Sequence, residues 1–404
     1  MYGLVLEGGG ARGAYHVGVY KAILEEGIEI GGITGTSIGA LNGAMIVQGD
    51  YEKCYELWHN ISYSMLIDNN EYEIERLKDL KFEKEDLVFL ANNIKTVIAD
   101  RGFDITPFKK LLDKYIHEEK IRESELDFGV VTVNVTDLKS IEIFKEDIPQ
   151  GEIKDYLLAS AFLPVFKTEK LGGKRYLDGG FYDNLPFNML KKKGYKNLII
   201  VRTNARGLTR KVEFDEANAI IVSPSEDIGR TFLIDSDKAK SNIELGYYDG
   251  LKAFRKLKGK RYYIEVDQPS EYYFQLLLNL DENQVEEIKK IVKTPDLPYK
   301  RLLFEYIIPK LGSVLGLSKE FTYEDFVISL LEKKAEAAKI ERFKVYKFKE
   351  LLDLVKMEKV SVERKEVEDL STIDRIIEMV DLPTLFHKEE VLLKITDIIF
   401  RESM

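Results

Sequence analysis

The first 260 residues alternate short apolar runs with stretches in which apolar side chains recur at helical spacing. Ala14 to Glu26 carries such a pattern and stops at Gly27, which predicts a helix. Ile38 to Val47 predicts a second helix, rich in small residues. Strands are predicted at Leu4 to Leu6, Ile28 to Thr34, Phe128 to Val135, Ser140 to Phe144, Leu198 to Val201 and Ala219 to Val222. This alternation indicates an α/β fold.

The pattern changes after about residue 260. Tyr262 to Val266 predicts one more strand, and the residues beyond it are mostly charged, helical in pattern and poor in glycine. Lys333 to Lys365 contains no proline or glycine and is dominated by lysine, glutamate, leucine and valine. We therefore expect two domains, with an α/β domain at 1–260 and a mostly helical accessory region at 261–404.

Composition and charge are those of an ordinary folded protein. The 404 residues are 45% hydrophobic and 32% charged, and the formal net charge of −10 argues against nucleic acid as a partner. The N-terminus lacks the basic region of a signal peptide, and no run of 18 apolar residues occurs. We expect a cytoplasmic protein, with peripheral contact to a membrane surface compatible with this composition. Cys54, the single cysteine, lies in a helical pattern and is expected to be a buried thiol.

The segment from Gly35 to Gly39 reads Gly-Thr-Ser-Ile-Gly and fits the G-x-S-x-G pattern of a nucleophile elbow. In such an elbow a strand turns sharply into a helix and exposes the serine hydroxyl. The two flanking glycines let neighbouring backbone approach closely, and the helix that follows points its first amides toward the site. Ser37 is therefore a candidate nucleophile. The alternative is an ordinary strand-to-helix turn in which Ser37 only caps the helix.

A glycine-rich loop lies between the first predicted strand and the first predicted helix. It consists of Gly8, Gly9, Gly10, Ala11, Arg12 and Gly13. Consecutive glycines leave backbone N–H groups able to converge on an anion, as in an oxyanion hole. The loop also matches the dinucleotide fingerprint G-x-G-x-x-G, but that site needs an acidic residue at the far end of the second strand, and Glu29 lies at its start. The pattern therefore favours the oxyanion hole. Arg12 either fixes the loop, binds a phosphate-bearing head group or is a plain surface residue.

A serine nucleophile needs a base, and the histidines are poorly placed for this role. The chain has four: His16, His59, His117 and His387. Only His387 follows the usual order of Ser, then acid, then His, and it lies in a charged helical segment. Asp178 precedes Gly179 and Gly180 and follows a short apolar run, which makes it a candidate carboxylate base. A plain Asp-Gly turn is the alternative, and Asp183 is the second choice.

Together, in this order, the three motifs resemble the patatin-like phospholipase family. The resemblance extends from Leu4 to about Lys258 and includes two lesser matches, Ala159 to Pro164 and Asn184 to Pro186. It implies a three-layer α/β/α fold with a mainly parallel central sheet. No counterpart to residues 261–404 is identified in the minimal family core. Three roles are open for this region: a lid, a membrane-docking surface or a dimerisation element. The sequence does not predict the oligomeric state.

The resemblance implies a catalytic dyad of Ser37 and Asp178 without a histidine. The amides of the glycine loop would hold the oxyanion of an acyl-enzyme mechanism, and neither a metal nor another cofactor is implied. The expected substrates are phospholipids or other fatty-acyl esters, cleaved by a phospholipase A or lysophospholipase. An acyltransferase with the same dyad remains an alternative, as does a nucleotide-binding module. Three apolar clusters either line an acyl path or form a helical core: Tyr272 to Phe274, Leu276 to Leu278, and Val314 with Leu315.

Overall fold

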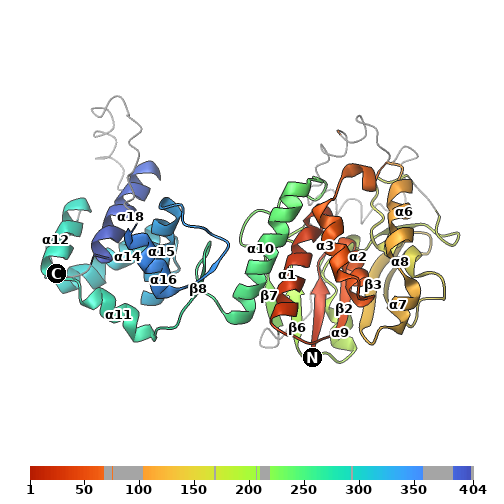
Figure 1. The fold of residues 1–404 in the computed structure, drawn as a ribbon, viewed down its shortest axis with the longest axis horizontal. Helices are drawn as coiled ribbons and strands as arrows, with labels where there is room; N and C mark the ends of the chain where they lie inside the picture. Colours follow the sequence, from red (N-terminus) through yellow and green to blue (C-terminus); the bar gives the residue numbers. More distant parts are fainter. Residues whose placement is uncertain are drawn as a thin grey trace. The chain divides into compact units, whose positions relative to one another are not determined.

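The computed structural model describes residues 1–67, 75, 103–167, 170–205, 207–209, 219–292, 294–357 and 385–401. The chain divides into two compact units, Met1–Arg255 and Lys256–Met404. Figure 1 shows the sheet and its helices in the first unit and a helical second unit. The division follows Arg255, whereas the change in sequence pattern predicts one after residue 260.

A seven-stranded sheet forms the centre of the first unit. Its strands are β1 (Tyr2–Leu6), β2 (Ile30–Thr36), β3 (Asp127–Asn134), β4 (Lys139–Phe144), β5 (Tyr176–Asp178), β6 (Leu198–Val201) and β7 (Ala219–Val222). The order is β4-β3-β2-β1-β6-β7, and β5 also pairs with β3. All pairs from β3 to β7 along this order are parallel, while β4 and β5 are antiparallel to β3.

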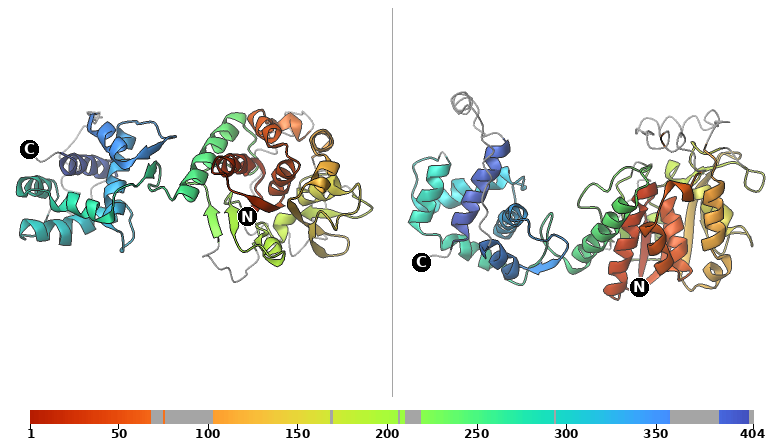
Figure 2. Two further views of the ribbon diagram at one scale, coloured as in Figure 1. Left: turned by 60° about the horizontal axis from the view of Figure 1, so that its bottom comes forward. Right: turned by 45° about the horizontal axis from the view of Figure 1, so that its top comes forward.

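Helices cover both faces of this sheet, as Figure 2 shows. The described helices are α1 (Ala14–Glu25), α2 (Ile38–Val47), α3 (Tyr51–His59), α6 (Thr106–Tyr115), α7 (Glu118–Glu123), α8 (Ile153–Ser160), α9 (Phe187–Lys192) and α10 (Ser236–Arg255), with short helices η1 (Gly10–Gly13), η2 (Tyr63–Met65) and η3 (Gly179–Phe181). α1, α2, α3 and α10 lie on one face, and α9 lies on the other.

Burial on both faces explains the apolar strands of the sheet. One buried cluster contains Val5 of β1 and, at alternate positions of β6, Leu198 and Ile200. These side chains pack with Leu190 of α9. Along β3 every residue from Phe128 to Asn134 is buried, as is typical of a strand in a covered parallel sheet. The expected α/β/α fold with a mainly parallel sheet is confirmed.

The second unit is mostly helical, as expected, and it contains the predicted strand, but one prediction within it is wrong in detail. The predicted strand at Tyr262 to Val266 is β8 (Tyr263–Glu265), and it pairs with β9 (Val345–Lys347) within this unit rather than extending the large sheet. β9 also interrupts the helical pattern predicted for Lys333 to Lys365, of which 358–365 lie outside the described residues. The helices are α11 (Ser270–Leu278), α12 (Glu282–Ile291), α13 (Tyr299–Arg301), η5 (Leu302–Ile307), α14 (Ile308–Val314), α15 (Tyr323–Ala337), α16 (Phe348–Met357) and α18 (Leu385–Ile399).

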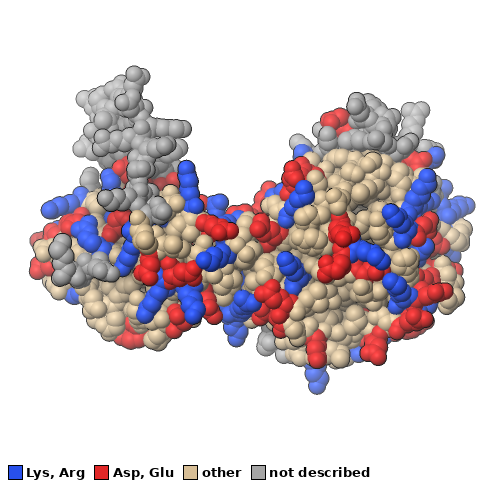
Figure 3. Space-filling model, in the orientation of Figure 1, with Lys and Arg blue, Asp and Glu red and all other residues tan. Residues whose placement is uncertain are grey.

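The apolar clusters of the second unit form its core. Tyr273 and Leu277 are fully buried, and Val314 and Leu315 pack against the same cluster. The interpretation of these residues as part of a helical core is therefore the one that the structure supports. On the face drawn in Figure 3, basic and acidic side chains are interspersed over both units, so the net charge of −10 is not concentrated there.

Candidate active site

Ser37 stands at the sharp turn between β2 and α2. Its backbone has φ 55° and ψ −124°, a conformation that costs a non-glycine residue about 1–3 kcal/mol and persists only where the surroundings impose it. The surroundings here are very close. A Cβ on Gly39 would lie 2.2 Å from the Leu6 carbonyl oxygen, and one on Gly35 would lie 2.3 Å from the Gly39 carbonyl carbon. Both glycines of the motif are therefore needed to form this turn.

One edge of β3 brings Asp178 to Ser37. β4 occupies the other edge of β3 from Gly129 to Asn134. β2 and β5 therefore share the remaining edge, where Val131 faces Thr36 of β2 and the next residue, Thr132, faces Asp178 of β5. Since Ser37 directly follows Thr36, adjacent positions of one hydrogen-bond ladder place the two side chains together.

The Asp178 carboxyl group is buried and hydrogen-bonded. Its side chain is 4% exposed, it accepts a hydrogen bond from the Gly180 amide at 2.7 Å, and the Ser37 hydroxyl donates a second one. Burial raises the pKa of Asp178 from 3.8 to about 6, because the charged form loses its hydration, and the two hydrogen bonds only partly oppose this effect. The group is thus mostly ionised at neutral pH and more basic than an exposed carboxylate.

The C-terminal end of α8 and the residues just after it hold the backbone of both Ser37 and Asp178 in place. The Ser37 amide donates to the Ser160 hydroxyl oxygen at 2.9 Å, and the Asp178 amide donates to the Phe162 carbonyl at 2.8 Å. Ser160 is fully buried. This segment is the lesser match at Ala159 to Pro164, for which sequence reasoning assigned no role.

The glycine loop lies beside Ser37, and its amides differ in availability. Hydrogen bonds to the chain occupy the amides of Gly8 (to Asn184 O, 3.1 Å), Ala11 (to Thr231 O, 2.8 Å) and Arg12 (to Gly9 O, 3.2 Å). Within the described part of the chain, the amides of Gly9 and Gly10 have no such partner. Gly8, Ala11 and Arg12 therefore build the loop, and Gly9 and Gly10 are the candidate oxyanion donors. Gly13 contributes its carbonyl oxygen, which accepts a hydrogen bond from Asn42 at 2.9 Å.

Arg12 fixes the loop to the segments that follow β6 and β7. Its guanidinium donates to the carbonyls of Asn204 at 2.7 Å and Gly229 at 2.8 Å. The fully buried Glu7 carboxylate anchors the segment after β6 by accepting from the amides of Thr203 at 2.6 Å and Asn204 at 3.0 Å. Burial raises the pKa of Glu7, against the effect of nearby Arg202. Sequence reasoning gave Glu7 no role, and its buried position was the missing information.

The other titratable candidates point elsewhere. His16 is fully buried against Asn42 (Nδ1 to Nδ2, 3.3 Å), and burial lowers its pKa to about 3, so it is neutral. Asp183 accepts from the Leu185 amide at 3.2 Å. Glu29 directly precedes β2, at the end of the strand opposite to Ser37. His387 belongs to α18, and its side chain lies outside the described residues.

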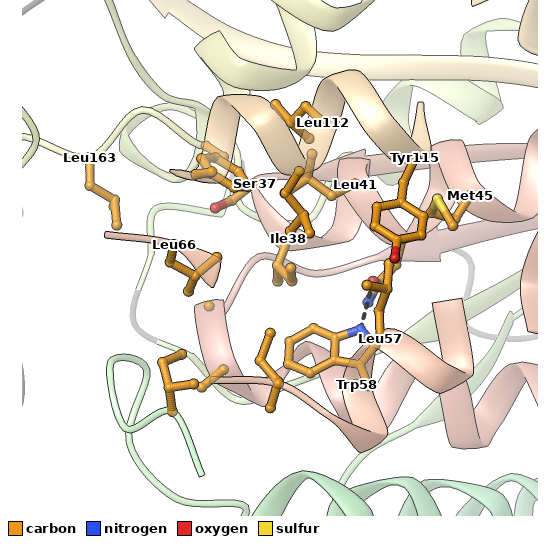
Figure 4. Close-up of a pocket in the computed structure, with 18 of the residues that line it drawn as sticks. Ser37, Ile38, Leu41, Met45, Leu57, Trp58, Leu66, Leu112, Tyr115 and Leu163 are labelled. Atoms are coloured by element: carbon orange, nitrogen blue, oxygen red, sulfur yellow. Dashed lines mark hydrogen bonds between the residues drawn. The ribbon is translucent and has the colours of Figure 1, made fainter. Parts of the chain in front are cut away.

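A cavity opens beside Ser37 and encloses about 1130 Å³ of empty space, part of it open to solvent (Figure 4). The described residues that line it all belong to the first unit, and none of them carries a charge. Trp58 forms part of the wall and donates from Nε1 to Asn42 Oδ1 at 3.0 Å. Cys54 also lines the cavity; it is buried as expected, and burial raises its pKa to about 12. Sequence reasoning did not predict this cavity.

Within the described ranges, no three His, Cys, Asp or Glu side chains are grouped so that they could hold a metal ion. Within the same ranges, no helix combines the length and the apolar character needed to cross a membrane.

Comparison with known proteins gives consistent matches. Lysophospholipase NTE1 of Saccharomyces cerevisiae is 26% identical over 315 residues, which cover 76% of this chain and 16% of that protein. Patatin-like phospholipase domain-containing protein 6 of Homo sapiens is 25% identical over 210 residues, or 51% of this chain and 14% of that protein. The chain thus spans about a sixth of the length of these relatives. The crystal structure of VipD from Legionella pneumophila covers 98% of this chain and 91% of its own at 14% identity, with a TM-score of 0.40.

The family model of patatin-like phospholipases matches residues 4–191. This range contains the glycine loop, the turn at Ser37, the strand that ends at Asp178, and the segment from Ala159 to Pro164 that holds the backbone of both residues. Through residues 4–191, just under half of its length, the chain is similar to the patatin-like phospholipase family.

Proposed function

We propose that this protein is a lipid acyl hydrolase of the phospholipase A or lysophospholipase type, with Ser37 as nucleophile and Asp178 as general base. One observation carries the proposal. A serine in a strained turn donates a hydrogen bond to a buried carboxylate whose pKa is raised to about 6, at the edge of an uncharged cavity. A nucleophile in contact with a base of suitable pKa is the requirement for covalent catalysis.

In the first half of the reaction, Ser37 Oγ attacks the ester carbonyl carbon and transfers its proton to Asp178. The negative charge that develops on the carbonyl oxygen is stabilised by the amides of Gly9 and Gly10, which have no other partner within the described part of the chain. When the tetrahedral intermediate collapses, the ester C–O bond breaks. The leaving alcohol takes the proton from Asp178, and the acyl group stays on Ser37.

In the second half, water replaces the alcohol. Asp178 accepts a proton from the water molecule as its oxygen attacks the acyl carbon, and the bond between Ser37 and the acyl group breaks. Asp178 gives this proton to the Ser37 oxygen, which restores both groups, and the fatty acid leaves. The reaction consumes one ester and one water and needs no redox partner. No step in this sequence requires a metal ion.

The cavity supports a fatty-acyl ester as substrate. Its described lining is uncharged, so an acyl chain gains hydrophobic stabilisation there, whereas a charged head group would lose its hydration without an ionic partner. The name of the yeast relative, a lysophospholipase, is consistent with this substrate class. Peripheral contact with a lipid surface in the cytoplasm belongs to the same proposal.

Replacement of Ser37 tests the proposal. Ser37→Ala should lower ester hydrolysis by about 10⁴-fold or more and abolish labelling by a fluorophosphonate probe, because the attacking atom is lost. Ser64→Ala, at an exposed serine of η2, is the matched control and should keep both. Undiminished turnover of phospholipid, lysophospholipid and short-chain esters by a folded Ser37→Ala variant would refute the proposal.

A further inference from the structure

Two helices present one apolar face each to the cavity. α2 contributes Ile38, Leu41 and Met45, and α6 contributes Phe108, Leu112 and Tyr115. Each set recurs at intervals of three or four residues, so each set forms a stripe along its helix. The cavity therefore extends along α2, away from the turn that carries Ser37.

Beyond Met45 and Tyr115, a side chain links the ends of the two helices. Gln48 follows α2 and is 6% exposed. Its side-chain Nε2 donates to the Tyr115 main-chain carbonyl at 2.7 Å, and its side-chain Oε1 accepts from the His117 main-chain amide at 3.0 Å. Because these bonds join the C-terminal ends of α2 and α6, Met45 and Tyr115 lie at the same end. Figure 4 shows these two side chains together, on the other side of Leu41 from Ser37.

The length of this channel follows from helix geometry. Ser37 and Met45 are eight residues apart, which corresponds to about 12 Å at about 1.5 Å per residue. A C–C bond of about 1.52 Å and a bond angle of about 111° advance an extended hydrocarbon chain by about 1.25 Å per carbon. About ten carbons therefore fit between Ser37 and the side chain of Met45.

We propose that Met45 and Tyr115 determine acyl-chain length, and that acyl groups of about ten carbons are the preferred substrates. The inference rests on the proposed function, since it places the acyl carbonyl at Ser37. Shorter chains leave part of the channel unfilled. Longer chains meet a wall that is held by two partly buried hydrogen bonds and moves only if these bonds break.

A series of p-nitrophenyl esters from butanoate to hexadecanoate tests the length limit. In the unmodified protein, kcat/KM should rise about fourfold for each added methylene up to about ten carbons, because each becomes buried in the channel. It should then stop rising and fall by tenfold or more at hexadecanoate. A continuous rise to sixteen carbons would overturn the inference.

Substitutions at the end of the channel should move the optimum. Met45→Ala removes three side-chain heavy atoms and should shift it by about three carbons toward longer esters, at about 1.25 Å per carbon. Tyr115→Ala should shift the optimum in the same direction. This variant keeps the bond to Gln48, because the acceptor is the main-chain carbonyl of residue 115, and it serves as the test if Met45→Ala does not fold. Met357→Ala makes the same chemical change at a methionine that is 82% exposed, and should leave the profile unchanged.

Fatty-acid binding separates this inference from the proposed function. Trp58, the single tryptophan of the chain, lines the cavity and reports occupancy by its fluorescence. In Ser37→Ala, affinity for free fatty acids should be highest near ten carbons. In the double variant with Met45→Ala, this maximum should move to longer fatty acids. If no ester is hydrolysed but this pattern holds, the proposed function fails and the length limit stands. If esters are hydrolysed and the Met45→Ala and Tyr115→Ala profiles match that of the unmodified protein, the length limit is wrong and the hydrolase stands.

Discussion

Replacing Asp178 by asparagine should strongly lower activity and, at neutral pH, stabilise the first unit. Burial raises the pKa of this carboxyl from 3.8 to about 6. At about 1.4 kcal/mol per unit of pKa, the ionised group costs about 3 kcal/mol of folding stability at pH 7.5. Asparagine has nearly the same shape, carries no charge, and its oxygen can still accept from the Gly180 amide. Asp178→Asn should therefore recover about this free energy.

The sign of the effect depends on pH. Between pH 3.8 and 6 the unfolded chain loses its Asp178 proton before the folded chain does, so this group lowers stability as pH rises through that range. The advantage of Asp178→Asn should be about 3 kcal/mol at pH 7.5 and well under 1 kcal/mol at pH 4. Denaturant unfolding followed by the fluorescence of Trp58 measures it, because this single tryptophan belongs to the first unit.

Two results would refute this reasoning. A variant that is less stable than the parent at pH 7.5, or equally stabilised at both pH values, would show that the carboxylate is not held at a raised pKa. In the same samples ester hydrolysis should fall by about 10²–10⁴-fold, the usual contribution of a general base. Strong residual hydrolysis would show that Asp178 is not the base.

The remaining predictions concern groups around the same site. The kcat/KM of the unmodified protein should fall tenfold per pH unit below about pH 6, as Asp178 gains a proton; a flat profile from pH 5 to 8 would contradict its role as base. Ser160→Ala leaves the buried Ser37 amide without a partner, at a cost of about 1–3 kcal/mol, and steady-state kinetics should show kcat reduced while KM changes little. Cys54, with a pKa of about 12, should react with a thiol reagent at pH 8 only after unfolding; modification of the native protein within minutes would show otherwise.

Much of the first unit could be predicted because its strands are short, apolar and bounded by glycines or polar residues. The error at β2, expected at Ile28 to Thr34 and found at Ile30–Thr36, arises because Gly31 and Gly32 blur the start of the strand. β9 was missed because three residues within a lysine-rich helical pattern carry too weak a signal. Its strand conformation depends on pairing with β8, which no local pattern reveals.

At the candidate site, the motifs alone single out Ser37 and Asp178, and the structure brings them into hydrogen-bond contact. The motifs could not show which amides of the glycine loop are available to an oxyanion, because that depends on distant acceptors such as the Thr231 carbonyl. The cavity was missed for a similar reason. Its wall on α6 has a visible signal, with Phe108 and Tyr115 among apolar residues at helical spacing, but only the tertiary structure places α6 beside α2.

The shared edge of β3 has a consequence for protein engineering. Backbone pairing sets the separation of Ser37 and Asp178, so it does not depend on the length of the turn just before β5. Gly172 and Gly173 form that turn, are exposed, and have open space where side chains would be. Leu171 and Lys174 close it with two backbone hydrogen bonds. A peptide tag or a small reporter domain inserted between the two glycines should leave the paired catalytic candidates in place, which makes this turn a natural graft point in the fold.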